Sequence, residues 1–275
     1  NYSHLTLSLT YLYRYRIFVL PLLFCIINNC YMNLTYYGHS CFAVETGGTV
    51  LLFDPFITPN DLAKGIDIQS IKADYILVSH GHSDHTADLT ALAKQTGAKV
   101  ISNFEITEWA AKQGIENIHP MNTGGKHDFG KFSVKCVVAQ HSSSFGDGSY
   151  AGNPMGFIIY TEEGNFYYSG DTALTLDMQL IPSMAKLNFA ILPIGDNFTM
   201  GIEDAISCMK MIACDVAIGV HYDTFGYIKI NHNEAITEFK KAGYQLLLPE
   251  IGETIQPKKK IKSLEPIRFP LGRKI

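Results

Sequence analysis

Three histidines and one aspartate fall within six residues, in the run His-Gly-His-Ser-Asp-His at residues 80–85. The run directly follows residues 75–78, Tyr-Ile-Leu-Val, whose β-branched and aromatic side chains predict a buried strand. Residues 86–97 follow with apolar side chains at helical spacing and end on glycine, which predicts a short helix. The histidine-rich run is therefore expected on the turn between a strand and a helix.

Imidazole and carboxylate groups in such a turn need partners, because burying them unpaired is costly. Metal ions suit this nitrogen and oxygen donor set, zinc first and then manganese or iron. His80 and His82 are two residues apart, so in an extended segment they point the same way and can share one ion. Asp84 and His85 follow once the chain turns and can face a second ion, and two ions about 3.5–4 Å apart are typical of hydrolytic enzymes.

Four ligands cannot fill two coordination spheres, so further ligands are expected downstream. Three residues have the required setting at the end of a predicted strand: His141, Asp171 and His221. Their strands are predicted at residues 132–138, 165–168 and 216–220. In α/β folds the carboxyl ends of strands collect ligands, so these residues are expected to join residues 80–85 at one edge.

Four further segments carry a resemblance to a known family. They are Tyr-Gly-His-Ser-Cys-Phe at 37–42, Gly-Asp-Thr at 170–172, Leu-Pro-Ile-Gly-Asp-Asn-Phe-Thr-Met-Gly at 192–201 and His-Tyr-Asp-Thr-Phe at 221–225. With the H-x-H-x-D-H run, they resemble the metallo-β-lactamase superfamily and, within it, a family of small metal-dependent hydrolases. L-ascorbate-6-phosphate lactonase and N-acyl-phosphatidylethanolamine phospholipase D are more distantly similar.

The resemblance implies an α/β fold, the single-domain four-layered αββα sandwich of the metallo-β-lactamase type. It also implies a division of the ligands between two divalent metal ions. The first ion would be held by His80, His82 and His141, the second by Asp84, His85 and His221, and Asp171 would bridge both. All seven positions carry the residue type that the family pattern requires.

Three segments are expected along the chain: an N-terminal extension at 1–31, the hydrolase domain at 32–256 and a basic tail at 257–275. Residues 14–27 combine two arginines with an apolar run, which resembles a secretory signal. The run is too short for a typical membrane span, so stable membrane insertion is not expected. No small-residue cleavage site follows, so we favour an extension outside the enzyme, with export as the alternative.

The charge is unevenly distributed. Residues 32–256 contain 13 basic and 25 acidic residues, a formal charge of −12. Such a surface repels a phosphate backbone, so a small molecule rather than nucleic acid is the expected substrate, and a small anion remains compatible with bound metals. The six cysteines show no C-x-x-C spacing, which favours a reducing, cytoplasmic setting.

These observations predict a metal-dependent hydrolase that uses a metal-bridging hydroxide on a small ester, lactone or phosphoester. Asp84 is the candidate to orient this hydroxide, and His39 is a second catalytic candidate that could equally be a structural turn residue. The alternatives are a phosphodiesterase acting on phospholipid-like substrates and a low-turnover metal sensor. Four residues beside the ligand loops could line the pocket or serve only packing and capping: Asp196, Thr199, Tyr222 and Thr224.

Overall fold

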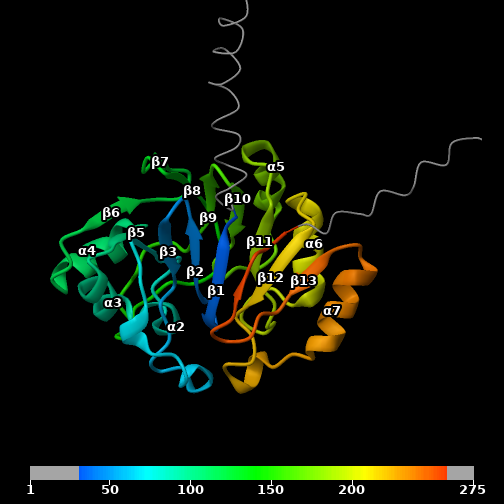
Figure 1. The fold of residues 1–275 in the computed structure, drawn as a ribbon, viewed down its shortest axis with the longest axis horizontal. Coiled ribbons are helices and arrows are strands. Elements are labelled where there is room, and N and C mark those ends of the chain that lie inside the picture. The colour runs from blue at the N-terminus through cyan, green and yellow to red at the C-terminus, as the bar shows by residue number, and fades with distance from the viewer. Residues whose placement is uncertain (1–30, 259–275) are drawn as a thin grey trace, which may run out of the picture.

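Two seven-stranded sheets lie face to face in the computed structural model, which describes residues 31–258 (Figure 1). Helices cover the outer face of each sheet, so the chain forms the predicted four-layered αββα sandwich, a single domain. The predicted extension and basic tail lie outside the described residues, apart from residues 31 and 257–258. The boundaries at 32 and 256 stay a prediction. None of the described helices is long and apolar enough to cross a membrane.

Both sheets mix parallel and antiparallel pairs. The first contains, in spatial order, β14 (Thr254–Ile255), β1 (Asn33–Gly38), β2 (Cys41–Thr46), β3 (Thr49–Phe53), β4 (Tyr75–Leu77), β5 (Lys99–Asn103) and β6 (Ile118–Met121). The second contains β13 (Gln245–Leu247), β12 (Val216–Val220), β11 (Phe189–Pro193), β10 (Gly164–Tyr168), β9 (Met155–Thr161), β8 (Phe132–Val138) and β7 (Lys126–Asp128). The strands predicted before the histidine-rich run and before the three downstream ligands are all present.

The main core fills the space between the two sheets. Its aromatic rings stack in pairs, Phe42 on Phe53 at 4.6 Å and Phe166 on Phe189 at 5.0 Å between centroids. Strands β11 and β12 are buried along their whole length because helices cover their other face. This burial explains why both strands consist of continuous apolar residues.

The helices divide between the outer faces of the sheets. Helices α2 (Ser83–Thr86), α3 (Leu89–Thr96) and α4 (Phe104–Lys112) lie on the side of the first sheet, and α5 (Ile181–Met184), α6 (Ile202–Met211) and α7 (His232–Lys241) on the side of the second. Single-turn 3-10 helices lie at Asp61–Ala63, Ile68–Ser70 and Gly226–Ile228, and a longer one at Leu176–Leu180. The apolar faces of α3 and α4 form a separate core with the first sheet.

The helix predicted at residues 86–97 is wrong in one respect, because two helices separated by a break occupy residues 83–96. Asp88 explains the break. Its carboxylate accepts hydrogen bonds from the backbone N–H groups of Ile57 and Thr58 at 2.6 and 2.8 Å, and its own N–H donates to the carbonyl of Pro55. These bonds tie the chain to the loop after β3 and start a new helix. Gly97 ends that helix with φ +70°, as predicted.

Candidate metal centre

All seven predicted ligands and His39 gather at one edge of the sandwich. Strands β1, β3 and β4 run in the same direction in the first sheet, as do β8, β10 and β12 in the second. Their carboxyl ends therefore meet at the same edge, the lower edge in Figure 1. These ends carry His39 after β1, His80 after β4, His141 after β8, Asp171 after β10 and His221 after β12. Asp84 and His85 are the second and third residues of the short helix α2 and do not lie on an open turn.

Asp171 lies at the middle of the cluster. Its Oδ2 atom is 2.9 Å from Nε2 of His221 and 3.2 Å from Nε2 of His85. The same oxygen is 3.7 Å from Nε2 of His141 and 4.0 Å from Nε2 of His80. One carboxylate oxygen therefore faces histidines from both predicted ligand groups.

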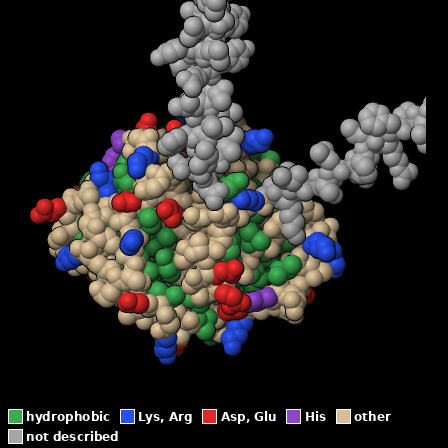
Figure 2. Space-filling view, viewed as in Figure 1, with side chains coloured by type: hydrophobic (Ala, Val, Ile, Leu, Met, Phe, Trp, Pro, Cys, Tyr) green, Lys and Arg blue, Asp and Glu red, His purple; other side chains and the backbone are tan. Residues whose placement is uncertain are grey.

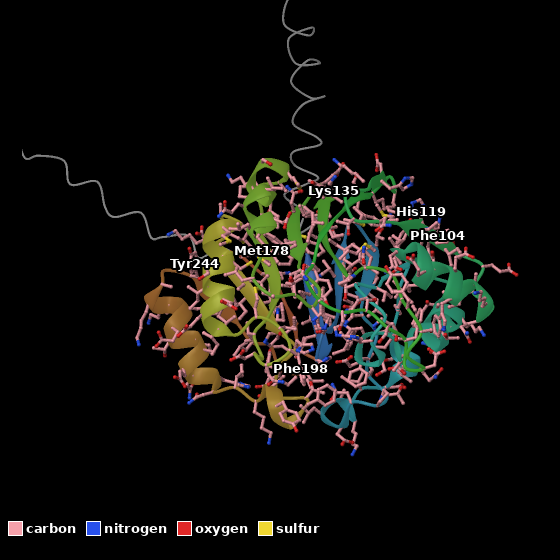
Figure 3. All side chains as sticks on the ribbon, turned by 180° about the vertical axis from the view of Figure 1, so that it is seen from behind. Phe104, His119, Lys135, Met178, Phe198 and Tyr244 are labelled. Carbon is pink, nitrogen blue, oxygen red and sulfur yellow. The ribbon has the colours of Figure 1, made fainter. Side chains whose placement is uncertain are left out.

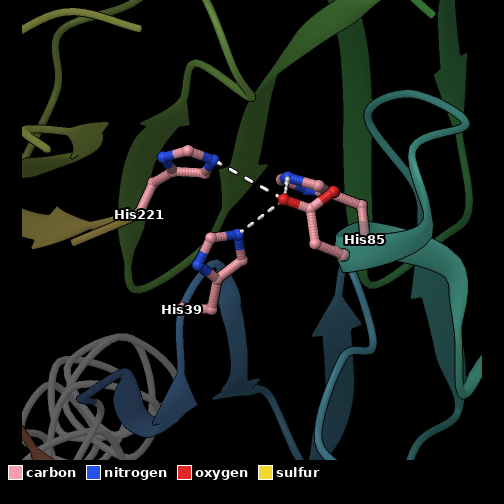
Figure 4. A group of neighbouring side chains, drawn as sticks. His39, His85 and His221 are labelled. Atoms are coloured by element: carbon pink, nitrogen blue, oxygen red, sulfur yellow. Dashed lines mark hydrogen bonds and ion pairs between the residues drawn. The ribbon is translucent and has the colours of Figure 1, made fainter. Parts of the chain in front are cut away.

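A second carboxylate, that of Asp84, lies on one side of the cluster. Its Oδ2 atom is 3.1 Å from Nε2 of His39, 3.8 Å from Nε2 of His221 and 3.9 Å from Nε2 of His85. Figure 4 shows the three imidazoles arranged around this single oxygen. The side chain of Asp84 is 23% exposed, so this part of the cluster is open to solvent.

Three groups of candidate ligand atoms lie close together in the described residues, and two of them follow the division implied by the family resemblance. The first contains His80, His82 and His141, and the second contains Asp84, His85 and His221 together with His39. The third, Asp54 with His80 and His85, joins residues of both. Within each group the candidate ligand atoms lie within 4.8 Å of one another. Each group is thus compact enough to contact one ion.

Two buried atoms show that the cluster fits a cation. Oδ1 of Asp171 is buried and makes no hydrogen bond, and the partners of the buried Nε2 of His85 are the carboxylates of Asp171 and Asp84 in the cluster itself. An unpaired buried polar atom costs free energy, so such atoms call for a partner. Because both atoms point into a set of imidazole and carboxylate donors, a divalent metal ion is the partner that suits them.

The protonation states also suit metal binding. Burial lowers the pKa of His80, His82 and His141, so their imidazoles are neutral near pH 7 and carry free lone pairs. Burial raises the pKa of Asp171, but His221 and His85 lower it by a larger amount, so the net pKa lies well below its usual value. The chain therefore presents neutral nitrogen from these three histidines and anionic oxygen from Asp171. Burial lowers the pKa of His85, but the carboxylates of Asp171, Asp54 and Asp84 raise it by more, so its net pKa lies well above the usual value and a bound cation would replace its proton.

Asp54 is a site residue that the sequence reasoning missed. It is fully buried, and its Oδ2 atom accepts hydrogen bonds from Nδ1 of His85 at 2.8 Å, Oγ of Ser79 at 2.6 Å and the hydroxyl of Tyr168 at 2.5 Å. Because the Ser79 hydroxyl donates to Asp54, it accepts from Nδ1 of His80 at 3.0 Å. Asp54 thereby directs Nε2 of both histidines into the cluster. Its position directly after the apolar run at residues 50–53 was the available signal.

His39 contacts the cluster as a buried neighbour of Asp84. Its Nδ1 atom is 2.9 Å from Oγ1 of Thr224, and its ring meets the edges of Phe56 and Phe225. Burial lowers the pKa of His39 to about 4. The neutral ring therefore donates a hydrogen bond from its Nε2–H to Asp84 and accepts one at Nδ1 from the Thr224 hydroxyl.

The other predicted pocket residues differ in position. Tyr222 is buried and stacks on Tyr36 behind His39, so its role is packing. Asp196 is exposed at the start of the loop after β11, where it accepts from the backbone N–H of Asn197 at 2.8 Å. Within the described residues, neither side chain forms a hydrogen bond with a predicted ligand.

Comparison with known proteins agrees with this architecture. Residues 33–221 match the family described as the beta-lactamase superfamily domain. A metal-dependent hydrolase of the UPF0173 family from Flavobacterium johnsoniae is 56% identical over 227 residues, and one from Christiangramia forsetii is 54% identical over 226 residues. Each alignment covers 82% of this chain and 100% of the relative.

Solved structures show the same fold. The metallo hydrolase Igni18 from the archaeon Ignicoccus hospitalis superposes with a TM-score of 0.75 at 33% identity, over 83% of this chain and 99% of that one. An isothiocyanate hydrolase from Delia radicum gut bacteria superposes with a TM-score of 0.67 at 18% identity, over 82% of this chain and 99% of that one. At this low identity, the similarity to the isothiocyanate hydrolase shows a shared fold alone.

The fold and the His/Asp cluster at its strand ends define a protein of the metallo-β-lactamase superfamily. Within that superfamily, the chain belongs to the UPF0173 metal-dependent hydrolases. It is accordingly a metal-dependent hydrolase, as the sequence predicted.

Proposed function

We propose that this hydrolase cleaves a small carboxylic ester or lactone with two divalent ions, zinc first. The proposed ligands are His80, His82 and His141 for one ion, Asp84, His85 and His221 for the other, and Asp171 between them. The proposal depends mainly on one observation, the Oδ2 atom of Asp171 within 4.0 Å of four histidine Nε2 atoms. A carboxylate in that position is suited to bridging two ions.

When bound, the ions would supply a hydroxide at neutral pH and polarise the carbonyl oxygen of the substrate. The chain itself contributes the handling of protons. Asp84 is anionic and partly exposed, so it can accept a hydrogen bond from the attacking water and orient its proton. His39 donates to the same carboxylate at 3.1 Å and so fixes its orientation. We therefore assign Asp84 the proton-handling role and His39 a positioning role.

The surroundings of the cluster favour a neutral ester over a phosphoester. Residues 31–258 contain no arginine. In the described part of the chain, the ion pairs of the proposed ligands join only histidine and aspartate side chains. Recognition of phosphate usually relies on arginine or lysine, and the lysines on the face in Figure 2 are dispersed rather than gathered in a patch. Cys41, Cys136 and Cys208 are free and buried, which supports a reducing, cytoplasmic setting.

Metal removal and restoration on defined substrates test this proposal. The chelated protein should lose hydrolysis of ethyl esters and lactones, and zinc should restore it. Asp171→Asn should lose at least about 100-fold in activity together with bound metal, since even residues outside the ligand set cost 10–100-fold. The exposed Asp177, six residues further on, provides the matched control Asp177→Asn.

Two results would contradict the proposal. Full metal occupancy in Asp171→Asn would exclude the bridging role. Hydrolysis of bis(p-nitrophenyl) phosphate without hydrolysis of any ester or lactone would replace the proposed substrate class with phosphodiesters.

A further inference from the structure

Four aromatic side chains lie on loops at the edge of the sandwich that carries the cluster, and two of them, Phe56 and Phe225, contact His39. They belong to the loops that follow β3, β11 and β12, and we call them the aromatic rim: Phe56, Phe198, Phe225 and Tyr227. Phe198 lies at the lower end of the molecule in Figure 3, the same end at which the ligand-bearing strands finish. The rim and the proposed ligands therefore share one edge of the sandwich.

The inner half of the rim contacts the centre through His39. The ring of Phe225 lies 5.4 Å and that of Phe56 5.5 Å from the His39 ring, both edge-on, and the two phenyl rings are 6.4 Å apart. Phe56 is 6% exposed, whereas Phe225 is 38% exposed. Phe225 thus presents an open apolar surface that is separated from the Asp84 carboxylate by a single imidazole ring.

The outer half of the rim is a second, more exposed pair of aromatic side chains. Phe198 and Tyr227 are 51% and 78% exposed, and their ring centroids are 6.2 Å apart. Exposed aromatic side chains gathered in one place are typical of binding surfaces. The opposite side of the centre is polar, since Nε2 of His82 lies 3.3 Å from the hydroxyl of Ser142.

We propose that the aromatic rim is the subsite for an apolar acyl group. The substrate is then an ester or lactone whose hydrocarbon chain or ring packs on Phe225, whose carbonyl lies at the centre and whose alcohol part faces Ser142. In the hydrolysis, water adds to the carbonyl carbon, the bond to the alcohol oxygen breaks, and that oxygen takes up the proton. This inference rests on the proposed ester hydrolysis and specifies its substrate.

Two ethyl esters that differ only in acyl length test the inference. Hydrolysis of ethyl octanoate should exceed that of ethyl acetate in kcat/KM by at least about tenfold, the factor expected from burying two methylene groups. Phe225→Ala should remove most of this preference through KM, while Phe225→Leu should keep it. The control is Phe104→Ala, an exposed phenylalanine on α4 that lies far from Phe198 in Figure 3.

Binding of the acids alone provides a second measurement that needs no turnover. Calorimetry on the zinc-loaded protein should show octanoate binding more tightly than acetate, and Phe225→Ala should remove the difference. If neither ester is hydrolysed but this difference is present, the acyl subsite stands and ester hydrolysis fails.

The acyl subsite is wrong if acyl length has no effect or if Phe225→Ala weakens both acids equally. It is also wrong if Phe225→Ala changes only the oligomeric mass in light scattering, because the rim would then be a contact between subunits.

Discussion

Asp54 accepts a hydrogen bond from Nδ1 of His85 at 2.8 Å, and both side chains are fully buried. The same carboxylate binds Ser79, which in turn accepts from His80. Two proposed ligands from different ligand groups thus take their orientation from one residue. Because Asp54 follows β3 with φ +42°, a backbone conformation that is uncommon outside glycine, the loop itself is shaped to present this carboxylate.

We therefore predict that Asp54→Asn weakens metal binding. The amide keeps one acceptor oxygen but places an N–H₂ group among the donors of Ser79, His85 and Tyr168, so one hydrogen bond at least is lost. Partners of this kind typically contribute 10–100-fold to metal affinity. Competition with a chromogenic chelator measures the change. The control Asp74→Asn removes an exposed carboxylate that accepts from the backbone N–H of Val50 at 2.8 Å, and it should leave the affinity unchanged.

Gly81 gives a second prediction, because the turn between His80 and His82 packs directly on another loop. A Cβ atom at Gly81 would lie 2.2 Å from Cβ of Ala151. Gly81→Ala should cost about 1–3 kcal/mol of the free energy of unfolding and reduce bound metal, since overpacking forces the two loops apart. Urea unfolding and metal analysis measure both effects.

Gly146→Ala is the matched control for Gly81, since the added Cβ has no atom within 4 Å. It should be neutral or stabilise the chain by up to about 1 kcal/mol. Equal behaviour of the two variants would show that the contact between Gly81 and Ala151 does not constrain the turn.

The division into two ligand groups predicts how single substitutions change metal content. His141→Ala should remove the ion near His80 and His82, and His221→Ala should remove the other, so each variant should retain about one of two ions. Native mass spectrometry counts the ions per chain. Loss of both ions in both variants would indicate a single cooperative centre, and loss of neither would exclude the assignment.

Local patterns predicted the strands and the candidate ligands at their carboxyl ends, because a buried strand and a His/Asp run are visible in a few consecutive residues. The four-layered sandwich was predicted from the family resemblance. Asp54 was missed since it is one carboxylate with no neighbouring ligand, and its role depends on β3 and β4 pairing in parallel. The aromatic contacts of His39 depend on packing between the loops after β1, β3 and β12, which no local spacing encodes. The break at Asp88 likewise comes from hydrogen bonds to a loop about 30 residues away.

The buried His39 predicts how stability depends on pH. Burial lowers its pKa from 6.5 to about 4 in the folded chain, whereas the unfolded chain binds the proton near 6.5. Between these values the unfolded state holds more protons, so the free energy of unfolding falls as the pH decreases from about 6.5 to about 4, by up to about 1.4 kcal/mol per pH unit from this residue. Below about pH 4 both states are protonated and the contribution becomes constant.

His39→Gln isolates this contribution from the other titrating ligands. Urea unfolding measures the free energy of unfolding of the parent and the variant, both without metal, so that acidification releases no ion. As the pH falls from about 6.5 to about 4, the parent should lose more of this free energy than the variant does. Parallel curves over that range would mean that His39 takes up its proton equally in both states. In that case the ring would not be the neutral donor to Asp84, and the positioning role assigned to it would be wrong.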